Sequence, residues 1–334
     1  MNNILDTATA FWRSAALFYA LRLNLFEKMG GNPLAVEEIA RLCGASEDFL
    51  RRLLRALTAM KMMVREGDKY HCSGDILDSI IPGRSGNLSH FVRLLGEDFS
   101  AGIWSRLPAP GAPPSFNAQV EENPPSPELF TMAMQNLAAR GEAQALVDAF
   151  DLSACENLLD IGGGSGAYTI SLCRRYPALT ALIVDLPEVS VITRKIVVEY
   201  ELDERIGVLA QDWNQIDIEG EFDAVLLSDV LYFAEQECRK IIETARKALV
   251  PGGKLGIRGY FLDDSDNRLF PALFDINLLV NNKDHSTPHI RDLAEWLQRA
   301  GFLQIQARPL TGLSYFLEAF APSSPSNRRQ TKNS

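Results

Sequence analysis

The chain has 334 residues, which is large for one compact domain and favours two. Hydrophobic residues make up 46% of it and charged residues 23%, the composition of a soluble globular protein with a substantial core. The formal net charge of −10 argues against nucleic acid or an anionic membrane as a partner, because a phosphate backbone favours clustered Lys and Arg.

Five cysteines are scattered along the chain, odd in number and never spaced as CxxC. This usage predicts reduced thiols, with neither a disulfide framework nor a metal site. The N-terminal stretch MNNILDTATAFWRS lacks a basic region followed by an apolar run, so no signal peptide is evident. No apolar run approaches the length of a membrane span. We therefore expect a soluble, cytoplasmic protein without a membrane partner.

Residues 3–107 predict a mostly helical first domain. The stretch FWRSAALFYALRLNLFEKMG carries apolar residues at three- and four-residue spacing and ends on Gly30 and Gly31, a helix stop. The next segment has the winged-helix pattern of a helix, a turn, a helix and a hairpin, at 35–42, Gly44, 46–61 and around 67–68.

A winged helix can bind DNA, and its second helix carries Arg51, Arg52 and Arg55. These arginines are interleaved with leucines that a folded domain would bury, and the whole chain is acidic. A DNA-binding regulator is therefore the weaker interpretation of this domain.

Residues 107–127, LPAPGAPPSFNAQVEENPPSP, hold seven prolines and little apolar periodicity, which is typical of a linker. A helix over about 128–150 leads into the next domain. The final SSPSNRRQTKNS is polar and unpatterned, which predicts disorder. We expect four parts: a winged-helix-like domain at 1–107, a linker at 108–127, a second domain at 128–321 and a disordered tail at 322–334.

From residue 157 onward, short apolar strands alternate with helical stretches: NLLDIG, TALIVDL, GVLAQD, FDAVLLSDV and GKLGIRGYF. Alternating strands and helices predict a parallel sheet with helices on both faces. The chain finishes with two strands, FLQIQAR and SYFLEAF, joined by the tight turn PLTGL, so the last strand runs antiparallel to the rest. The predicted fold class is α/β and Rossmann-like.

A glycine-rich turn, DIGGGSG, follows the first of these strands and precedes a helix. Glycines let a ligand approach the backbone without Cβ interference, and the N–H groups of a helix start favour a carboxylate or other electronegative group. Asp185 ends the next strand, 23 residues after Gly162, where its carboxylate is placed to accept hydrogen bonds from two ribose hydroxyls. The pattern predicts a nucleoside cofactor, with NAD still open.

Three details favour a different nucleoside. Asp160 precedes the glycines, giving D-x-G-x-G-x-G instead of the dinucleotide pattern G-x-G-x-x-G. QDW at 211–213 ends the third strand with an acid and an aromatic ring suited to the amino edge and face of adenine. ALVPGGKLGI supplies a Pro-Gly-Gly turn into the fifth strand. Together these motifs resemble the class I S-adenosylmethionine-dependent methyltransferases, whose seven-stranded sheet ends in the same antiparallel hairpin.

The resemblance covers nearly the whole chain. The winged-helix N-terminus, DIGGGSG, VDLPEV, QDW, PGGKL and WLQRAGF together are similar to the small-molecule O-methyltransferases of the caffeate and hydroxyindole type. The resemblance implies a homodimer formed through the N-terminal domain, which helps to close the partner's active site.

The resemblance also implies S-adenosylmethionine as the cofactor and assigns its binding residues by position. The methionine part lies at Gly162 and its neighbours, which are Asp160, Gly163, Gly164 and Gly166. Asp185, with Leu186 beside it, binds the ribose, and Asp212 with Trp213 binds the adenine. Ser228 falls where the family often has a lysine near the cofactor.

The stretch LLSDVLYFAEQECRK departs from the family pattern. A hydroxyl acceptor is helped by a base that removes its proton, and in the family that base is a histidine after the fourth strand, supported by an acid after the fifth. Aligned through DVL, this chain has Tyr232 in place of the histidine, and GIRGYF places Gly259 in place of the acid. We interpret Asp229, nearby, as an exposed loop acid or a helix cap.

Three explanations are open for this departure. The enzyme methylates oxygen with another base, such as His285 or His289 in NNKDHSTPHIRD, beside the family's substrate pocket. It methylates carbon or nitrogen, with Tyr232 as a hydrogen-bond donor or proton relay; relatives that methylate a tetrapyrrole ring carbon also have Tyr here. Or it keeps the cofactor and performs other chemistry, as hydroxylase and pericyclase members of the family do.

The candidate catalytic residues are therefore Tyr232, His285 and His289. The predicted function is S-adenosylmethionine-dependent methyl transfer, to oxygen or carbon, on a small aromatic or polycyclic pigment or secondary-metabolite substrate. FPALFDINLLVNN, residues 270–282, matches the family's substrate-lining helix, and its apolar stripe also suits core packing. A non-methylating enzyme on the same scaffold and the DNA-binding regulator are the alternatives.

Overall fold

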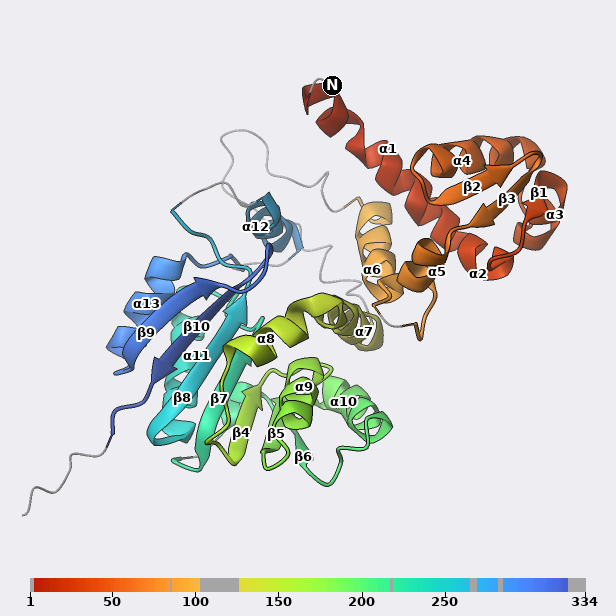
Figure 1. Cartoon of the computed structure of the whole chain (residues 1–334). Helices are drawn as coiled ribbons and strands as arrows, with labels where there is room; N and C mark the ends of the chain where they lie inside the picture. Colours follow the sequence, from red (N-terminus) through yellow and green to blue (C-terminus); the bar gives the residue numbers. More distant parts are fainter. Residues whose placement is uncertain are drawn as a thin grey trace, which may run out of the picture. The chain divides into compact units, whose positions relative to one another are not determined.

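The computed structural model describes residues 3–84, 86–102, 126–216, 219–264, 269–281 and 285–323 (Figure 1). The chain divides into two compact units, one of residues 1–105 with 132–140 and one of residues 106–131 with 141–334. The predicted linker at 108–127 and tail at 322–334 lie almost entirely outside the described residues. Among the helices that are described, none combines the length and the apolar character that a membrane crossing requires.

The first unit combines helices with a small sheet. Its elements in chain order are α1 (Asn3–Arg22), α2 (Leu25–Met29), β1 (Leu34–Ala35), α3 (Val36–Cys43), α4 (Glu47–Ala59), β2 (Met63–Glu66), β3 (Lys69–Cys72), α5 (Gly74–Ile80) and α6 (Ser89–Ser100). The strands pair antiparallel in the order β1-β3-β2. The order α3, α4, β2, β3 matches the helix–turn–helix and hairpin that the sequence predicts.

The first predicted helix is interrupted in the structure. Apolar spacing predicts one helix up to Gly30, but α1 ends at Arg22 and α2 begins at Leu25. Asn24 between them has φ 52°, in the left-handed region that Asn tolerates better than most side chains. Gly30 then ends α2 with φ 56°, the helix stop that the sequence predicts.

The arginines at the start of α4 are paired with carboxylates. Arg51 lies 2.5 Å from Glu37 of α3 and 3.8 Å from Glu47, and Arg52 lies 3.1 Å from Asp48. The opposite face of α4 buries four leucines: Leu50, Leu53, Leu54 and Leu57. Two of the three basic side chains noted in the sequence thus have acidic partners within their own unit.

The second unit is built on a seven-stranded sheet. Its helices are α7 (Pro127–Leu137), α8 (Ala143–Ala149), α9 (Ala167–Arg175), α10 (Pro187–Glu199), α11 (Glu235–Ala248), α12 (Leu269–Asn281) and α13 (Ile290–Arg299), with part of α7 in the first unit. Its strands are β4 (Asn157–Ile161), β5 (Thr180–Asp185), β6 (Ile206–Ala210), β7 (Phe222–Ser228), β8 (Leu249–Gly259), β9 (Leu303–Pro309) and β10 (Tyr315–Phe320). A π-helical turn, Ala138–Glu142, joins α7 to α8.

The sheet has the order β6-β5-β4-β7-β8-β10-β9. The first five strands in this order run parallel, while β10 is antiparallel to both β8 and β9. The predicted α/β fold class with an antiparallel last strand is therefore confirmed. The Pro-Gly-Gly stretch, expected as a turn, lies inside β8, which begins at Leu249 and pairs irregularly with β7 between Phe222 and Ala224.

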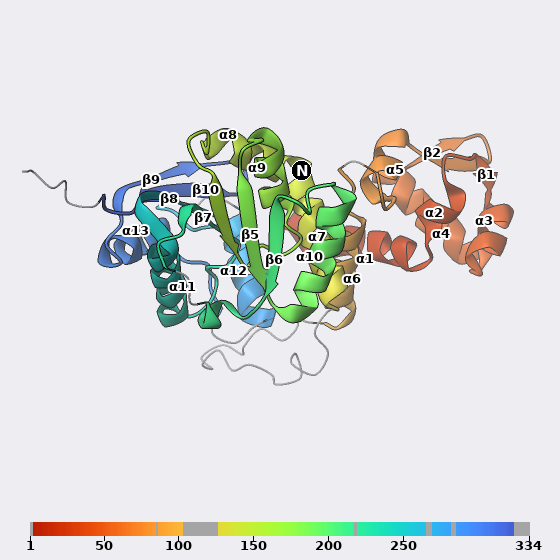
Figure 2. The same ribbon diagram turned by 90° about the horizontal axis from the view of Figure 1, so that it is seen from below.

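Helices cover both faces of this sheet. In Figure 2, α8 and α9 lie on one face while α11 and α13 lie on the other. The central strands β4 and β7 are mostly apolar, as expected of strands that are covered on both sides. The strand order reverses between β4 and β7, and in α/β sheets ligands bind at the carboxyl ends of the strands beside such a reversal.

Candidate active site

The glycine loop connects β4 to α9 at the carboxyl edge of the sheet. Three of its glycines have positive φ values that side chains rarely adopt: Gly162 at 70°, Gly164 at 56° and Gly166 at 77°. A Cβ at Gly162 would lie 2.4 Å from Val230 Cγ1, and one at Gly163 would lie 2.6 Å from Asp160 Oδ2. Among the described residues, no atom lies within 4 Å of a Cβ at Gly164. The loop is packed from below and open at its middle, which suits a ligand that approaches its backbone.

Asp160 supports the loop from inside the sheet. Its side chain is fully buried, and its Oδ2 accepts a hydrogen bond from the Thr169 hydroxyl at 2.6 Å. Its Oδ1 has no hydrogen-bond partner within the described part of the chain. Burial, together with the nearby carboxylate of Asp185, raises the pKa of Asp160 to about 7.

The raised pKa of Asp160 predicts a pH dependence of stability. Below about pH 4 the Asp160 carboxyl is protonated in both the folded and the unfolded protein, and its contribution to the free energy of unfolding is fully present. This contribution is lost as the pH rises to about 7. Asp160→Asn cannot titrate, so we expect its free energy of unfolding to decline less over this range, by about 2–4 kcal/mol. Urea titrations at several pH values measure the difference.

The exposed Asp148 provides the matched control for this experiment. Asp148→Asn, on the surface of α8, should keep the pH dependence of the wild type. If Asp160→Asn also keeps it, Asp160 does not carry a proton in the folded protein near neutral pH.

Asp185 meets the glycine loop from the neighbouring strand. Its Oδ2 accepts from the N–H of Gly164 and its Oδ1 from the N–H of Leu186, both at 2.7 Å. Burial raises the pKa of Asp185, and the two N–H donors oppose that shift. Leu186 is exposed at the start of α10. Each carboxylate oxygen keeps a further lone pair available to a ligand hydroxyl.

The remaining residues assigned to the cofactor lie along the same edge. Asp212 follows β6 and accepts from the N–H of Asn214 at 2.8 Å, which caps a short 3-10 turn. Trp213, in that turn, is partly buried against the core of the sheet, and Ser228 is buried at the end of β7. Because β6, β5, β4 and β7 are consecutive in the sheet, the structure brings these residues to one edge with the glycine loop.

Tyr232 uses its hydroxyl in two hydrogen bonds inside the protein. The hydroxyl donates to Asp229 Oδ1 at 2.9 Å and accepts from the N–H of Tyr260 at 2.8 Å. Burial, and then the neighbouring Asp229 carboxylate, holds the pKa of Tyr232 well above its usual value. The phenol is therefore neutral, with its proton directed at a carboxylate.

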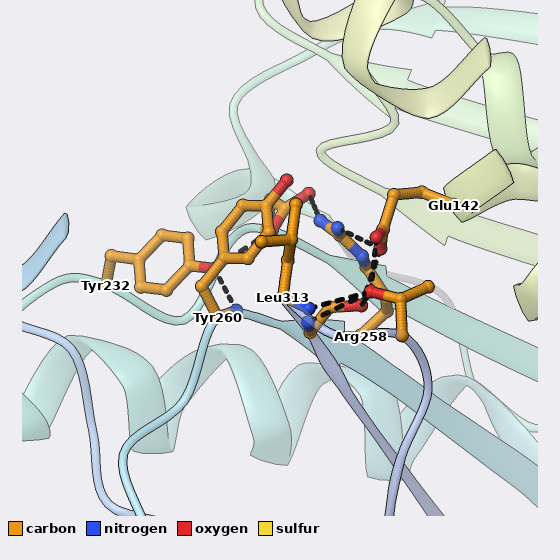
Figure 3. A network of polar contacts seen from close by, with 8 residues as sticks. Glu142, Tyr232, Arg258, Tyr260 and Leu313 are labelled. Carbon is orange, nitrogen blue, oxygen red and sulfur yellow. Dashed lines mark hydrogen bonds and ion pairs between the residues drawn. The ribbon is translucent and has the colours of Figure 1, made fainter. Parts of the chain in front are cut away.

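Asp229 belongs to a largely buried group of charges, the Arg258 cluster of Glu142, Arg258 and Asp229. Figure 3 shows Glu142 beside Arg258 in this cluster. Arg258 is fully buried in β8 and pairs with both carboxylates. Glu142 also accepts from two hydroxyls, those of Thr311 and Ser314. Asp229 is thus neither an exposed loop acid nor a helix cap, because its carboxylate serves as a counter-charge for Arg258.

The two carboxylates of the Arg258 cluster keep the guanidinium ionised. Burial disfavours the charged guanidinium, but Asp229 and Glu142 outweigh burial and keep the pKa of Arg258 well above its usual value. The Arg258 guanidinium lies 4.3 Å from the ring centre of Tyr260 and 5.5 Å from that of Tyr168. Burial raises the pKa of Tyr260 to about 12. The cluster therefore contains permanent charge surrounded by neutral phenols.

An aromatic ring fills the place where the resemblance predicts an orienting acid. A Cβ at Gly259 would lie 2.4 Å from Phe261 Cζ, so any side chain there would collide with that ring. Phe261 is buried, and its ring centre lies 6.2 Å from that of Tyr232. The two departures noted in the sequence are therefore coupled in space: aromatic packing occupies the position of a histidine–acid pair.

The two candidate histidines have different surroundings. His289 Nδ1 accepts from the N–H of Arg291 at 3.1 Å and so caps α13, while its Nε2 lies 3.4 Å from Asp264. The ring of His285 packs edge-on against Phe233, with ring centres 4.8 Å apart. The adjacent Ser286 donates its N–H to the carbonyl of Tyr232 at 2.9 Å. His285 therefore lies at the corner where β7 ends, whereas the Nδ1 of His289 is used by a helix.

Aromatic side chains form a wall beside Tyr232. Phe274 of α12 has its ring centre 5.2 Å from that of Tyr232 and 5.3 Å from that of Tyr260. Phe270, one turn earlier, lies 4.9 Å from Tyr260. The same helix exposes three apolar side chains: Leu269, Leu273 and Ile276. The predicted apolar stripe thus packs on one side and is open on the other.

Sequence reasoning missed Glu142, Arg258, Thr311 and Ser314. A signal for one of them was present, because Arg258 lies in the apolar stretch LGIRGYF of a central strand. An arginine is rarely buried unless it is paired, so its position indicates carboxylate partners. The two partners are Glu142, 116 residues before Arg258, and Asp229, 29 residues before it. No local pattern in the sequence identifies them.

Comparison with known proteins agrees with this architecture. The chain matches an O-methyltransferase domain model over residues 88–303 and an O-methyltransferase dimerisation domain model over residues 5–73. The 3-hydroxy-5-methyl-1-naphthoate 3-O-methyltransferase of Streptomyces sahachiroi is 27% identical over 310 residues, 90% of this chain and 89% of that protein. The tetracenomycin polyketide synthesis 8-O-methyl transferase of Streptomyces glaucescens is 24% identical over 322 residues, 93% and 94% of the two chains.

A solved structure shows the same fold over almost the full length. Human N-acetylserotonin methyltransferase, in complex with S-adenosylmethionine, superposes with a TM-score of 0.85 at 22% identity, covering 96% of this chain and 97% of that one. The family resemblance drawn from the motifs is confirmed by the two domain models. The chain belongs to the O-methyltransferase family and is an S-adenosylmethionine-dependent methyltransferase that carries the family's dimerisation domain.

Proposed function

We propose that this enzyme methylates a hydroxyl group of a fused aromatic small molecule of secondary metabolism. The observation that carries the proposal is the aromatic wall of Tyr232, Tyr260, Phe270 and Phe274 at the end of β7, beside the glycine loop. Flat rings pack favourably against aromatic side chains in offset or edge-on geometry. The relatives named for a naphthoate and for tetracenomycin support an aromatic acceptor of this kind.

In this proposal the edge of the sheet holds the cofactor. The loop from Asp160 to Gly166 binds the methionine part, Asp185 with Leu186 the ribose, Asp212 with Trp213 the adenine, and Ser228 lies beside them. When bound, S-adenosylmethionine supplies an electrophilic methyl group on its sulfonium. The open backbone at Gly164 and the two remaining lone pairs of Asp185 support this assignment.

The chain contributes alignment and a proton acceptor. Alignment of the acceptor oxygen with the methyl group supplies much of the rate. Tyr232 does not act as the base, because its hydroxyl proton is bonded to Asp229 and its phenol is neutral. Of the two histidines, His285 lies at the active corner, so we assign removal of the acceptor proton to His285.

The protein acts as a homodimer in this proposal. The dimerisation domain at residues 5–73 includes most of α1, which exposes four large apolar side chains: Ile4, Phe11, Trp12 and Tyr19. Apolar side chains gathered on one surface helix are typical of an interface. The cytoplasmic location expected from the sequence stays a prediction.

An acceptor panel tests the proposed function. The enzyme is incubated with S-adenosylmethionine and a hydroxynaphthoic acid, the methyl ether of that acid, or an aliphatic alcohol. We expect one S-adenosylhomocysteine and one methyl ether per turnover with the free naphthol, and neither product with the other two compounds.

The other functions predict different results in this assay or in measurements of cofactor and DNA binding. Cofactor binding without methyl transfer to any acceptor would favour the non-methylating enzyme. Methyl transfer to the blocked ether, with a product that contains no methyl ester, would indicate carbon methylation. Absence of cofactor binding, with tight and salt-dependent binding to duplex DNA, would favour the regulator.

A further inference from the structure

The Arg258 cluster carries a surplus negative charge. Two carboxylates, Glu142 and Asp229, face one guanidinium. The three neighbouring phenols of Tyr168, Tyr232 and Tyr260 add no charge of their own, because burial raises the pKa of each above its usual value and keeps it neutral. Burial raises the pKa of Asp229 even though Arg258 opposes that shift, as expected for a carboxylate that one shared guanidinium compensates only in part. The cluster therefore favours a cationic group beside Asp229.

The negative charge that Arg258 does not fully compensate lies at Asp229. The Glu142 carboxylate is 7% exposed and bonded to Arg258 and two hydroxyls. The Asp229 carboxylate is 25% exposed and is the part of the cluster that a ligand can reach. Arg258 Nε is, in addition, a buried donor without a hydrogen-bond partner in the described part of the chain. The cluster therefore has one carboxylate more than it has cations, and one donor without an acceptor among the described residues.

Asp229 lies next to the start of α9. The residue after it, Val230, packs directly beneath Gly162 of the glycine loop. Tyr168, in the first turn of α9, contacts the same guanidinium that holds Asp229. The N–H groups at a helix start favour a carboxylate, and in an α-amino acid the ammonium group is one carbon atom away from that carboxylate. An amino acid at the start of α9 would thus present its ammonium group toward Asp229.

We propose that Asp229 binds the α-ammonium group of the cofactor's methionine part, and that Arg258 and Glu142 are positioning residues for its carboxylate. The proposal rests on the proposed function, because it assumes that the glycine loop holds S-adenosylmethionine. It adds a residue that the family resemblance does not supply, since the resemblance places only Ser228 of this stretch near the cofactor.

Calorimetric titration with three nucleosides tests the proposal. S-adenosylmethionine and S-adenosylhomocysteine both carry the ammonium group, whereas 5′-methylthioadenosine lacks the whole amino acid. For Asp229→Asn we expect the dissociation constants of the first two to rise about 10- to 100-fold, as for loss of a charged hydrogen bond, and that of methylthioadenosine to stay unchanged. The unchanged nucleoside also shows that the variant is folded.

Other outcomes overturn the proposal. Unchanged affinity for S-adenosylhomocysteine, with only S-adenosylmethionine weakened, would mean that Asp229 interacts with the sulfonium. Equal weakening of all three nucleosides would mean a structural role. Failure of the wild type to bind any of them would instead contradict the proposed function. Glu235→Gln, which removes an exposed carboxylate of α11, is the matched control and should leave all three affinities unchanged.

Glu142→Gln provides a second variant that leaves Asp229 intact. With Glu142 neutral, Arg258 compensates Asp229 more fully, so we expect S-adenosylmethionine and S-adenosylhomocysteine to bind several-fold more weakly. Methylthioadenosine should bind as it does to the wild type. If the ratio of the affinities for S-adenosylmethionine and methylthioadenosine is unchanged in this variant, the cluster does not act on the cofactor. If Asp229→Asn does not fold, Glu142→Gln still tests whether the Arg258 cluster acts on the cofactor.

Discussion

Replacing Arg258 by methionine is expected to lower the free energy of unfolding by about 3–5 kcal/mol, because it leaves the buried carboxylate of Glu142 and the partly buried carboxylate of Asp229 without a counter-charge. The guanidinium is fully buried, and Glu142 is nearly so. Methionine has a similar length but no charge, so the loss measures the electrostatics more than the packing. Denaturant titration followed by near-ultraviolet circular dichroism measures the change.

Two further variants separate this explanation from a general effect of mutating arginine. Arg239→Met removes an exposed ion pair with Glu235 on α11 and should change the stability by less than about 1 kcal/mol. Adding Glu142→Gln and Asp229→Asn to Arg258→Met should restore much of the lost stability, since no unpaired charge remains. A loss below about 1 kcal/mol in Arg258→Met alone would show that the cluster is not held together by charge.

Replacing Asp185 by alanine is expected to abolish cofactor binding, with a loss of more than about 100-fold in affinity. Two effects add in this variant. The N–H groups of Gly164 and Leu186 lose their common acceptor, so the glycine loop loses its side-chain hydrogen bond to the end of β5. In the proposed function the ribose hydroxyls lose their acceptor as well. Calorimetry with S-adenosylmethionine measures the affinity.

Asp185→Asn and Glu188→Ala are informative comparisons. The asparagine variant keeps one acceptor oxygen and should retain part of the affinity. Glu188, exposed in the first turn of α10, should be replaceable without effect. An affinity of Asp185→Ala within about threefold of the wild type would place the cofactor elsewhere on the protein.

Local patterns in the sequence predict most of the second unit. The strand runs, the glycine loop and the terminal hairpin appear because each depends on residues close in the chain. A single polar residue that interrupts a helix is harder to predict. Asn24 interrupts the first helix by adopting a left-handed conformation, although the apolar spacing continues across it.

Contacts between distant segments account for what the sequence does not reveal. Glu142 and Arg258 are 116 residues apart, and Thr311 bonds to Glu142 from the turn before the last strand. The hydrogen bonds of Tyr232 depend on where β8 ends, because the Tyr232 hydroxyl accepts from the backbone N–H of Tyr260, the residue after that strand. The sequence shows that a histidine is missing at this corner, but the side-chain contacts explain what the tyrosine does there.

Methyl transfer is expected to proceed without proton removal by Tyr232. This expectation is tested by comparing kcat of Tyr232→Phe and His285→Gln at saturating S-adenosylmethionine with a naphthol acceptor, with His71→Gln of β3 as the control. We predict that Tyr232→Phe and His71→Gln stay within about tenfold of the wild type and that His285→Gln loses about 100-fold or more, the usual contribution of a general base. The opposite order, a 100-fold loss in Tyr232→Phe with cofactor affinity retained and His285→Gln near the wild type, would contradict the account.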